Sequence, residues 1–379
     1  MRGAYPGAAC RPSRGLAMAS RQRTRNPTMT DVAAMAGVSQ TTVSLVLNGA
    51  VSARLSTPTR QRVNEAARKL GYRLVKRVAS RSSAIDKKGI GFVVDEISTD
   101  PWCAIALDGA REKAWEFGLT LQVAVTRGDP EIEEAVFAQL ATLPLLGLIY
   151  GAIQTRRIAP TPALYRIPTV LLNCYAADRS LPSIVPGEVL GGRVATERLI
   201  RSGHRRIAMI EGESGMDASR DRLKGYRQAL ANHDILFDPD LVRPGNWEPS
   251  AGYQQTLELM RHDRPPTAIF CANDMMALGC YDALKELGRA IPGDVSVVGY
   301  DDREVAQFTR PPLTTVLLPH FEMGTLAAES LIGQPAVANR RAAQVKVECP
   351  LMERGSVGPP PGAGESPARA GKQSARPLP

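Results

Sequence analysis

The chain has 379 residues, of which 44% are hydrophobic and 22% are charged. This composition is close to average globular usage, which excludes a fibrous or wholly disordered chain, and the length accommodates two or three domains. The net charge of +9 is uneven, because residues 1–88 hold 17 Lys and Arg against three acidic residues, a net of +14, whereas the remainder is at −5. A basic head on a slightly acidic body is typical of nucleic-acid binding, since Lys and Arg neutralise phosphates.

Residues 1–27 are rich in Arg, Gly, Pro and Ser and predict a disordered basic tail. They contain no apolar run of signal-peptide length, and no segment approaches the roughly 18 apolar residues that span a bilayer. The six cysteines form no CxxC pair and have no histidine at zinc-ligand spacing. We therefore expect reduced core thiols, no metal site and a cytoplasmic protein whose first residue is Met1 or Met18.

Three short helical patterns follow in residues 28–72. Thr28 followed by Asp31 is a capping box for a first helix, which we expect to end near Met35, before a left-handed turn at Gly37. Ser39 can cap a second helix over residues 40–48. The apolar face of this second helix carries Val43, Val46 and Leu47. We expect it to pack on Val32, Ala33 and Val38.

The opposite face of the second helix carries mostly short polar side chains. These residues are Gln40, Thr41, Ser44, Leu45 and Asn48. Such a face, after an abrupt turn and in a positively charged domain, is typical of a recognition helix in the DNA major groove. An ordinary helical hairpin with a solvated face is the alternative, and the charge asymmetry favours DNA binding.

Residues 74–88 are basic and polar and predict a hinge or linker. From residue 89 to 352, short apolar runs alternate with helical stretches, which predicts two α/β lobes with parallel sheets and helices on both faces. A ligand would then bind outside the carboxyl ends of the strands, between the lobes. Residues 353–379 are low in complexity and predict a second disordered tail. We expect strands buried on both faces at residues 90–94, 119–125, 147–150, 169–172, 206–210, 267–271 and 295–300. The expected helices are 104–117, 189–202, 222–231, 253–261 and 274–287.

Several segments together resemble the lactose-repressor/galactose-repressor (LacI/GalR) family. The motifs are TMTDVAAMAGVSQTTVSLVLNG (28–49), TRQRVNEAARKLGY (59–72), GHRRIAMI (203–210), RLKGYRQAL (222–230), CANDMMALG (271–279), VSVVGYDD (295–302) and PPLTTV (311–316). They cover roughly residues 28–352 in the family's order. The resemblance implies an all-α helix-turn-helix headpiece over residues 28–73, joined by a hinge to an α/β two-lobed, periplasmic-binding-protein-like core with parallel sheets. It also implies a homodimer on a near-palindromic DNA operator.

The resemblance assigns DNA contacts within the headpiece. The polar face of the second helix would meet bases or nearby phosphates. The residues that would position the headpiece on the backbone are Thr28, Ser39, Thr42, Thr59 and Tyr72. Two positions depart from the family. Leu45 stands where many relatives have Arg, so it would at best touch a thymine methyl group. Arg81 stands where the family hinge has a minor-groove Leu wedge, which leaves Val78 as the candidate wedge.

In the core, the resemblance places Arg222, Asn273 and Asp301 at the effector site. Their combined donors and acceptors suit a polyhydroxylated ligand. Each also has an ordinary structural role open to it, as a surface helix residue, a polar contact or a turn former.

Three further core residues are site candidates by the same resemblance. Trp102 and Trp247 fall where relatives have aromatic or apolar site residues, and either could stack on a sugar ring or simply fill the core. Arg220 is a weaker candidate. Glu188 falls where relatives commonly have Asp or Asn, and we expect it to cap the following helix.

Other functions are less compatible with the sequence. No GxGxxG follows a strand, no GxxxxGK[ST] loop occurs, and the four histidines form no catalytic arrangement, so we expect neither an enzyme nor a cofactor. His204 is expected to end a helix, where a cation interacts with the helix dipole. A cytoplasmic or exported solute-binding protein without DNA regulation is the alternative function, and the basic headpiece argues against it.

The sequence therefore predicts a DNA-binding transcriptional regulator, most often a repressor in this family. Its operator affinity would be controlled by a small-molecule effector, a sugar or sugar derivative by family precedent, with nucleobase-type ligands as the alternative. Induction and corepression both fit. We expect a homodimer with no membrane partner, located in the cytoplasm and on the nucleoid when bound to its operator.

Overall fold

The computed structural model describes residues 29–38, 40–47, 57–70, 89–98, 102–333 and 342–362. The chain divides into two compact units, Met1–Val78 and Ala79–Pro379. The first contains the headpiece and the second the core, and the division falls within the predicted linker. None of the helices in the described ranges combines the length and the apolar character that a membrane crossing needs.

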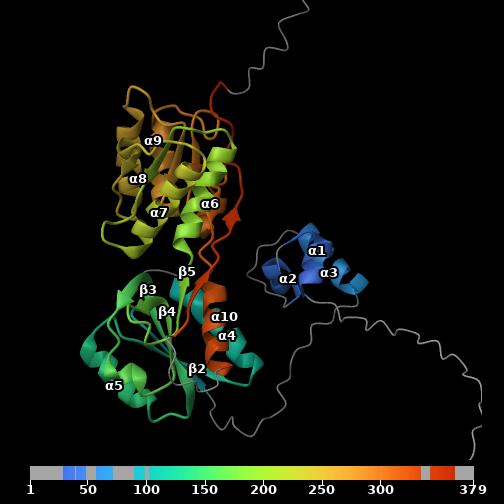
Figure 1. Ribbon diagram of the computed structural model, residues 1–379, viewed down its shortest axis with the longest axis vertical. Coiled ribbons are helices and arrows are strands. Elements are labelled where there is room, and N and C mark those ends of the chain that lie inside the picture. The colour runs from blue at the N-terminus through green and yellow to red at the C-terminus, as the bar shows by residue number, and fades with distance from the viewer. Residues whose placement is uncertain are drawn as a thin grey trace, which may run out of the picture. The chain divides into compact units, whose positions relative to one another are not determined.

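The headpiece contains helices α1 (Met29–Ala36), α2 (Gln40–Leu47) and α3 (Thr57–Leu70), coloured blue in Figure 1. Gly37, at a φ of 66°, ends α1, and the N–H of Val38 donates to the carbonyl of Ala33 at 3.1 Å. Glycine adopts this left-handed conformation without a steric penalty, which allows the abrupt turn before α2. The predicted helix, turn and helix are confirmed.

A small apolar core holds the three helices of the headpiece together. Its buried members are Val32, Ala33, Ala36, Val43, Val46, Val63, Ala66 and Ala67, and Val38, Leu47 and Leu70 pack against them. The predicted packing of the second helix on the first is therefore confirmed. The small side chains let the helices approach closely.

The lobe that begins the core, the N-lobe, is built on a six-stranded parallel sheet with strand order β11-β5-β4-β3-β1-β2. The strands are β1 (Gly89–Val94), β2 (Thr120–Val125), β3 (Leu145–Ile158), β4 (Thr169–Ala176), β5 (Ser183–Pro186) and β11 (Gln344–Val347). Helices α4 (Trp102–Glu116) and α10 (His320–Ile332) pack in one apolar cluster with this sheet, and α5 (Pro130–Leu140) packs in another. Figure 1 shows α10 beside α4, although they lie far apart in sequence.

The other lobe, the C-lobe, is built on a four-stranded parallel sheet with order β7-β6-β8-β9. Its strands are β6 (Ile207–Ile210), β7 (Val242–Arg243), β8 (Ala268–Cys271) and β9 (Ser296–Val298), and its helices are α6 (Glu188–Arg201), α7 (Asp217–Asn232), α8 (Pro249–Met260) and α9 (Asp274–Glu286). A short antiparallel pair, β10 (Thr315–Val316) and β12 (Leu351–Met352), completes it. The chain passes between the lobes three times, from β5 to α6, from β10 to α10 and from β11 to β12 (Figure 1).

The fold departs from the sequence-based expectation at strand β2. We expected it to be buried on both faces, but Val123 and Val125 are 45% and 44% exposed. The expectation was wrong because β2 is the edge strand of the sheet. Its apolar side chains follow strand propensity rather than burial.

The expected disorder from residue 353 onward is wrong for residues 353–362. Ser356 is buried, and its Oγ donates to the carbonyl of Val297 at 2.6 Å. The expectation that His204 ends a helix is also wrong, since α6 ends at Arg201. The buried imidazole of His204 instead contacts the carbonyl of Gly358 at 2.9 Å, and burial lowers its pKa. A neutral, hydrogen-bonded His204 therefore ties the end of the described chain to the C-lobe.

The five described cysteines are all free and buried, as predicted for core thiols. Burial raises the pKa of Cys174 and of Cys349 to about 12. Because the thiolate is the reactive form, these thiols are chemically inert near neutral pH. Cys10 lies outside the described residues.

Candidate effector site and DNA-binding helix

Polar side chains of the core gather at the carboxyl ends of the parallel strands, where the two lobes meet. Asn273 lies just after the end of β8, and Asp301 lies just after the end of β9. Arg222 is on α7. Trp102, at the start of α4, follows β1 in the N-lobe. We call these four residues with Trp247 the interlobe site. The structure thus brings together five of the six effector-binding residues proposed from the sequence.

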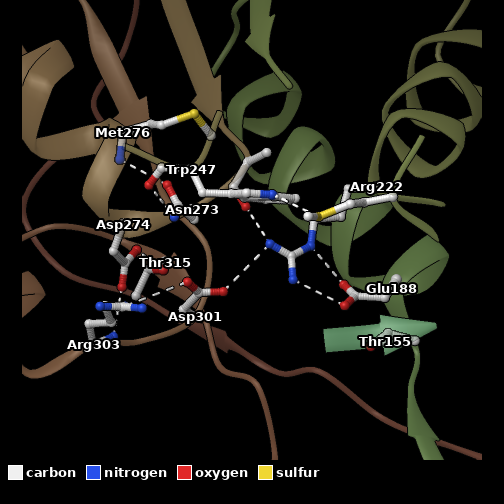
Figure 2. Close-up of polar contacts among 12 residues, drawn as sticks. Thr155, Glu188, Arg222, Trp247, Asn273, Asp274, Met276, Asp301, Arg303 and Thr315 are labelled. Carbon is white, nitrogen blue, oxygen red and sulfur yellow. Dashed lines mark hydrogen bonds and ion pairs between the residues drawn. The ribbon is translucent and has the colours of Figure 1, made fainter. Parts of the chain in front are cut away.

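Arg222 is the centre of the C-lobe part of this site (Figure 2). Its Nε and Nη2 donate to the two carboxylate oxygens of Glu188 at 2.7 and 3.0 Å. Its Nη1 donates to the carbonyl of Ala272 and, at 3.5 Å, to Asp301. The guanidinium carbon lies 3.7 Å from the ring centroid of Tyr300. The side chain is 4% exposed, so most of its hydrogen-bonding capacity is used inside the protein.

The packing of α6 against α7 positions this ion pair. A Cβ on Gly192 would meet the backbone of Arg222, and a Cβ on Gly225 would meet the backbone of Val189. Only glycine permits this approach, which sets Glu188 at the start of α6 beside Arg222. The expectation that Glu188 caps α6 is wrong, because Gly187 is the N-cap residue and makes no side-chain cap hydrogen bond. Burying a carboxylate without a counter-charge costs more free energy than leaving a helix without a side-chain cap, so Glu188 pairs with Arg222.

The charges in this cluster reinforce one another. Burial by itself lowers the pKa of the Arg222 guanidinium, but the negative charge of Glu188, with a further contribution from Asp301, outweighs burial and raises the pKa above its usual value. Arg222 is therefore a permanent cation. Asp301 has a φ of 113°, a conformation that side chains rarely adopt, and its carboxylate lies between Arg222 and Arg303.

Asn273 and Trp247 form the remaining part of the C-lobe side (Figure 2). The Oδ1 of Asn273 accepts from the N–H of Met276 at 2.8 Å, so Asn273 is the N-cap residue of α9. Its Nδ2 donates to the carbonyl of Trp247 at 2.9 Å. The Nε1 of Trp247 lies 3.0 Å from the sulfur of Met216. Asn273 thus fixes the loop that carries Trp247.

Trp102 contributes an aromatic surface from the N-lobe side. Its ring stacks on the imidazole of His320, with centroids 5.0 Å apart and 20° between the planes. The guanidinium of Arg303 lies 5.3 Å from the same ring. Both Trp102 and His320 are buried and line a small recess with Asn173, against strands β1, β3 and β4. His320 was not singled out from the sequence, and no local motif marks it.

Arg220 lies apart from this cluster. Its side chain is 61% exposed and pairs with Asp217 at 2.6 Å and with Asp221 at 3.4 Å. Asp217 also accepts from the hydroxyl of Tyr175 at 2.6 Å, which links the start of α7 to strand β4 of the other lobe. Arg220 therefore contributes to a contact between the lobes rather than to the buried polar cluster.

The proposed DNA-binding residues are only partly covered by the described structure. The backbone of α2 includes Gln40, Thr41, Ser44 and Leu45, whose side chains lie outside the described set. Thr42 and Thr59 are half-buried, on α2 and α3. The residues wholly outside the described ranges are Thr28, Ser39, Asn48, Tyr72 and Val78.

Comparisons with known proteins match both units of the chain. Residues 28–73 match the bacterial regulatory proteins of the lacI family, and residues 196–357 match a periplasmic binding protein-like domain. The ribose operon repressor of Escherichia coli strain K12 is 32% identical over 337 residues, covering 87% of this chain and 99% of that protein. The chain belongs to the lacI family of bacterial regulatory proteins.

Other relatives and solved structures agree with this assignment. The HTH-type transcriptional repressor PurR of Histophilus somni strain 129Pt is 31% identical over 87% of this chain and 98% of the relative. Among solved structures, a lac repressor dimer bound to operator and the anti-inducer ONPF is 29% identical with a TM-score of 0.60, covering 88% of this chain and all of that chain. A complex of the regulator CelR with cellobiose is 31% identical with a TM-score of 0.58, covering 87% and 99%. This lacI-family chain is a DNA-binding transcriptional regulator and not an enzyme.

Proposed function

We propose that the protein is a homodimeric repressor whose operator affinity is controlled by a sugar or sugar derivative bound at the interlobe site. The observation that carries the proposal is the convergence of Arg222, Asn273, Asp301 and Trp102 where the lobes meet, in a chain whose other unit is a helix-turn-helix. Two relatives support the ligand class by their names, the ribose operon repressor and the CelR–cellobiose complex. The repressor would act in the cytoplasm, at the nucleoid.

Helix α2 is the proposed recognition helix. It follows the left-handed turn at Gly37 and is held by its apolar face, so its polar face would lie in the major groove. Gln40, Thr41, Ser44, Leu45 and Asn48 would face bases or nearby phosphates. The backbone contacts would come from Thr28, Ser39, Thr42, Thr59 and Tyr72, with Val78 at the minor-groove wedge.

Dimerisation would give the operator its symmetry. Two identical headpieces related by a two-fold axis read two half-sites about one helical turn apart, so the operator would be near-palindromic. Effector binding would favour one arrangement of the lobes and thereby alter operator affinity. Couplings of this kind are typically 1–3 kcal/mol, or roughly 5- to 150-fold in affinity.

Selection of bound sequences from a random DNA pool by the full-length protein tests the DNA-binding part. We expect two half-sites in inverted repeat. Gln40→Ala and Ser44→Ala should each lower the ratio of operator to random-DNA affinity, because they remove base contacts and leave phosphate contacts in place. Gln61→Ala, on the exposed face of α3, is the matched control and should leave that ratio unchanged. An unchanged ratio in both α2 variants would show that α2 is not the recognition helix.

A further inference from the structure

His320 has an unusual position and an unfilled hydrogen-bonding capacity. It is the first residue of α10, directly after the chain returns from the C-lobe to the N-lobe, and it is 4% exposed. Within the described part of the chain, its Nε2 has no hydrogen-bond partner. Buried polar atoms in natural proteins nearly always have a partner, from protein, water or ligand. A partner for this nitrogen is therefore expected from outside the chain.

The recess beside His320 is too small for a whole ligand. Its cavity volume is about 10 Å³, which is room for roughly one water-sized group. Apolar side chains and the Trp102 ring form most of its lining. The recess therefore admits a single hydroxyl-sized group, and the rest of a ligand that places one there would extend toward the C-lobe residues of the interlobe site.

The other polar side chain in the lining, Asn173, is already satisfied. Its Oδ1 accepts from the hydroxyl of Thr155 at 2.6 Å. Its Nδ2 donates to the carbonyls of Ala152 and Ile153 at 3.0 and 3.2 Å. Asn173 thus shapes the recess, whereas Nε2 of His320 is the atom in the lining with bonding capacity to spare.

The surrounding charges are balanced before any ligand binds. In the described structure, the arginines near the site each face a carboxylate: Arg222 with Glu188 and Asp301, Arg303 with Asp301, Arg156 with Asp95, and Arg220 with Asp217. A phosphate or carboxylate on a ligand would have to draw a guanidinium away from its partner. An ammonium group would have to approach the cations Arg222 and Arg303. An uncharged ligand disturbs neither arrangement.

We propose that the recess takes one hydroxyl group of an uncharged effector, and that this hydroxyl is hydrogen-bonded to Nε2 of His320. This inference rests on the proposed function, in which the effector binds at the interlobe site. Burial, and then the charge of Arg222, lower the pKa of His320 to about 3, so the ring stays neutral at physiological pH. A hydroxyl both donates and accepts, and therefore satisfies a neutral imidazole in either tautomer.

A panel of matched ligands tests the charge rule on the full-length protein by calorimetry. The uncharged probes are D-ribose, D-glucose, D-galactose and cellobiose. Their charged counterparts are ribose 5-phosphate, glucose 6-phosphate, gluconate and glucosamine, and hypoxanthine represents nucleobases. We expect at least one uncharged saccharide to bind, and every charged member of the panel to bind at least tenfold more weakly.

Three variants test His320 with the saccharide that binds. His320→Phe keeps an aromatic ring against Trp102 but removes the nitrogen, and should weaken binding about tenfold or more. His320→Gln places an amide near the position of Nε2 and should bind within about threefold of the wild type. His262→Phe, a half-buried histidine after α8, is the matched control and should bind as the wild type does.

A spectroscopic readout separates contact from a merely structural role. The chain has four histidines, so single-residue variants assign each imidazole ¹⁵N resonance. The saccharide should shift the ¹⁵N resonance of Nε2 of His320 and leave those of His233 and His262 unchanged.

Tighter binding of a charged ligand or of hypoxanthine, equal binding by His320→Phe, or an unshifted Nε2 resonance would each overturn the proposal. Should no panel member bind while an operator is still selected, the ligand class is wrong but the DNA-binding function stands; loss of operator selection as well would refute the proposed function.

Discussion

The two sides of the interlobe site differ in whether their polar atoms have hydrogen-bond partners within the protein. On the C-lobe side, the donors of Arg222 are directed to Glu188, Asp301 and the carbonyl of Ala272. On the N-lobe side, His320 lines a recess with one nitrogen that lacks a partner within the described chain. One side is thus organised mainly by the fold, whereas in the proposed function a ligand would complete the other. Stability should therefore depend on the first side and ligand affinity on the second.

The largest expected effect comes from breaking the buried ion pair. Glu188→Ala leaves the permanently charged Arg222 buried without its main partner. Removing one member of such a pair typically costs 3–5 kcal/mol, so we expect the free energy of unfolding to fall by about that amount. Urea unfolding of the purified protein measures it. Glu258→Gln, which breaks the exposed pair with Arg261, is the control and should cost under about 1 kcal/mol.

Replacing both members of the pair separates the effect of the unpaired charge from the effect of packing. In Glu188→Met with Arg222→Met, no charge is left buried, and well-packed apolar replacements of buried pairs are often neutral. We expect the double variant to recover at least about 2 kcal/mol of the stability that the single Glu188 variant loses. Its response to the effector should be absent. A double variant no more stable than Glu188→Ala would show that the loss comes from packing and not from an uncompensated charge.

The pH dependence of stability should show the neutral state of His320. Its pKa is lowered from 6.5 to about 3 in the folded protein, so the unfolded chain binds a proton at a pH where the folded chain does not. The stability held by neutral His320 is therefore present above pH 6.5 and is lost as the pH falls toward 3. Between pH 7.5 and 5.5, His320→Phe should lose about 1.4 kcal/mol less than the wild type. Identical pH profiles would mean that His320 titrates normally.

The smallest effect should appear in the stability of His320→Phe at pH 7.5. The variant keeps the stack on Trp102 and removes a buried atom that lacks a partner, so we expect a change within about 1 kcal/mol in either direction. Thermal unfolding without ligand measures it. A loss of several kcal/mol would assign His320 a structural role and remove the contrast between the two sides.

The headpiece was predictable because its signals are local. Gly37 marks the turn, and the apolar spacing of Val43, Val46 and Leu47 orients α2. In the core, helices α4, α6, α7, α8 and α9 were predicted in place and type, whereas α5 and α10 were not among the expected helices. Helix α5 begins with a signal that is visible in the sequence, since Asp129 accepts from the N–H groups of Glu131 and Ile132. Short strands such as β5 and β11 have too few residues to show a period.

The chemistry of the interlobe site was less predictable, because it depends on contacts between distant segments. Arg222 and Asp301 were recognisable by resemblance, but the partner of Arg222 was not. Glu188 reaches it only because two glycines let α6 and α7 approach closely. His320 meets Trp102 across more than two hundred residues of sequence. A single histidine that lacks a motif gives no local sign of such a contact.

In the proposed function, a ligand at the interlobe site controls DNA binding by the headpiece. Fluorescence anisotropy of the selected operator, with and without the saccharide that binds, measures this coupling most directly. We predict a change in operator affinity of roughly 5- to 150-fold for the wild type at saturating ligand. His320→Phe should need a correspondingly higher ligand concentration for the same change. An operator affinity that stays constant while calorimetry shows the saccharide bound would contradict the claim.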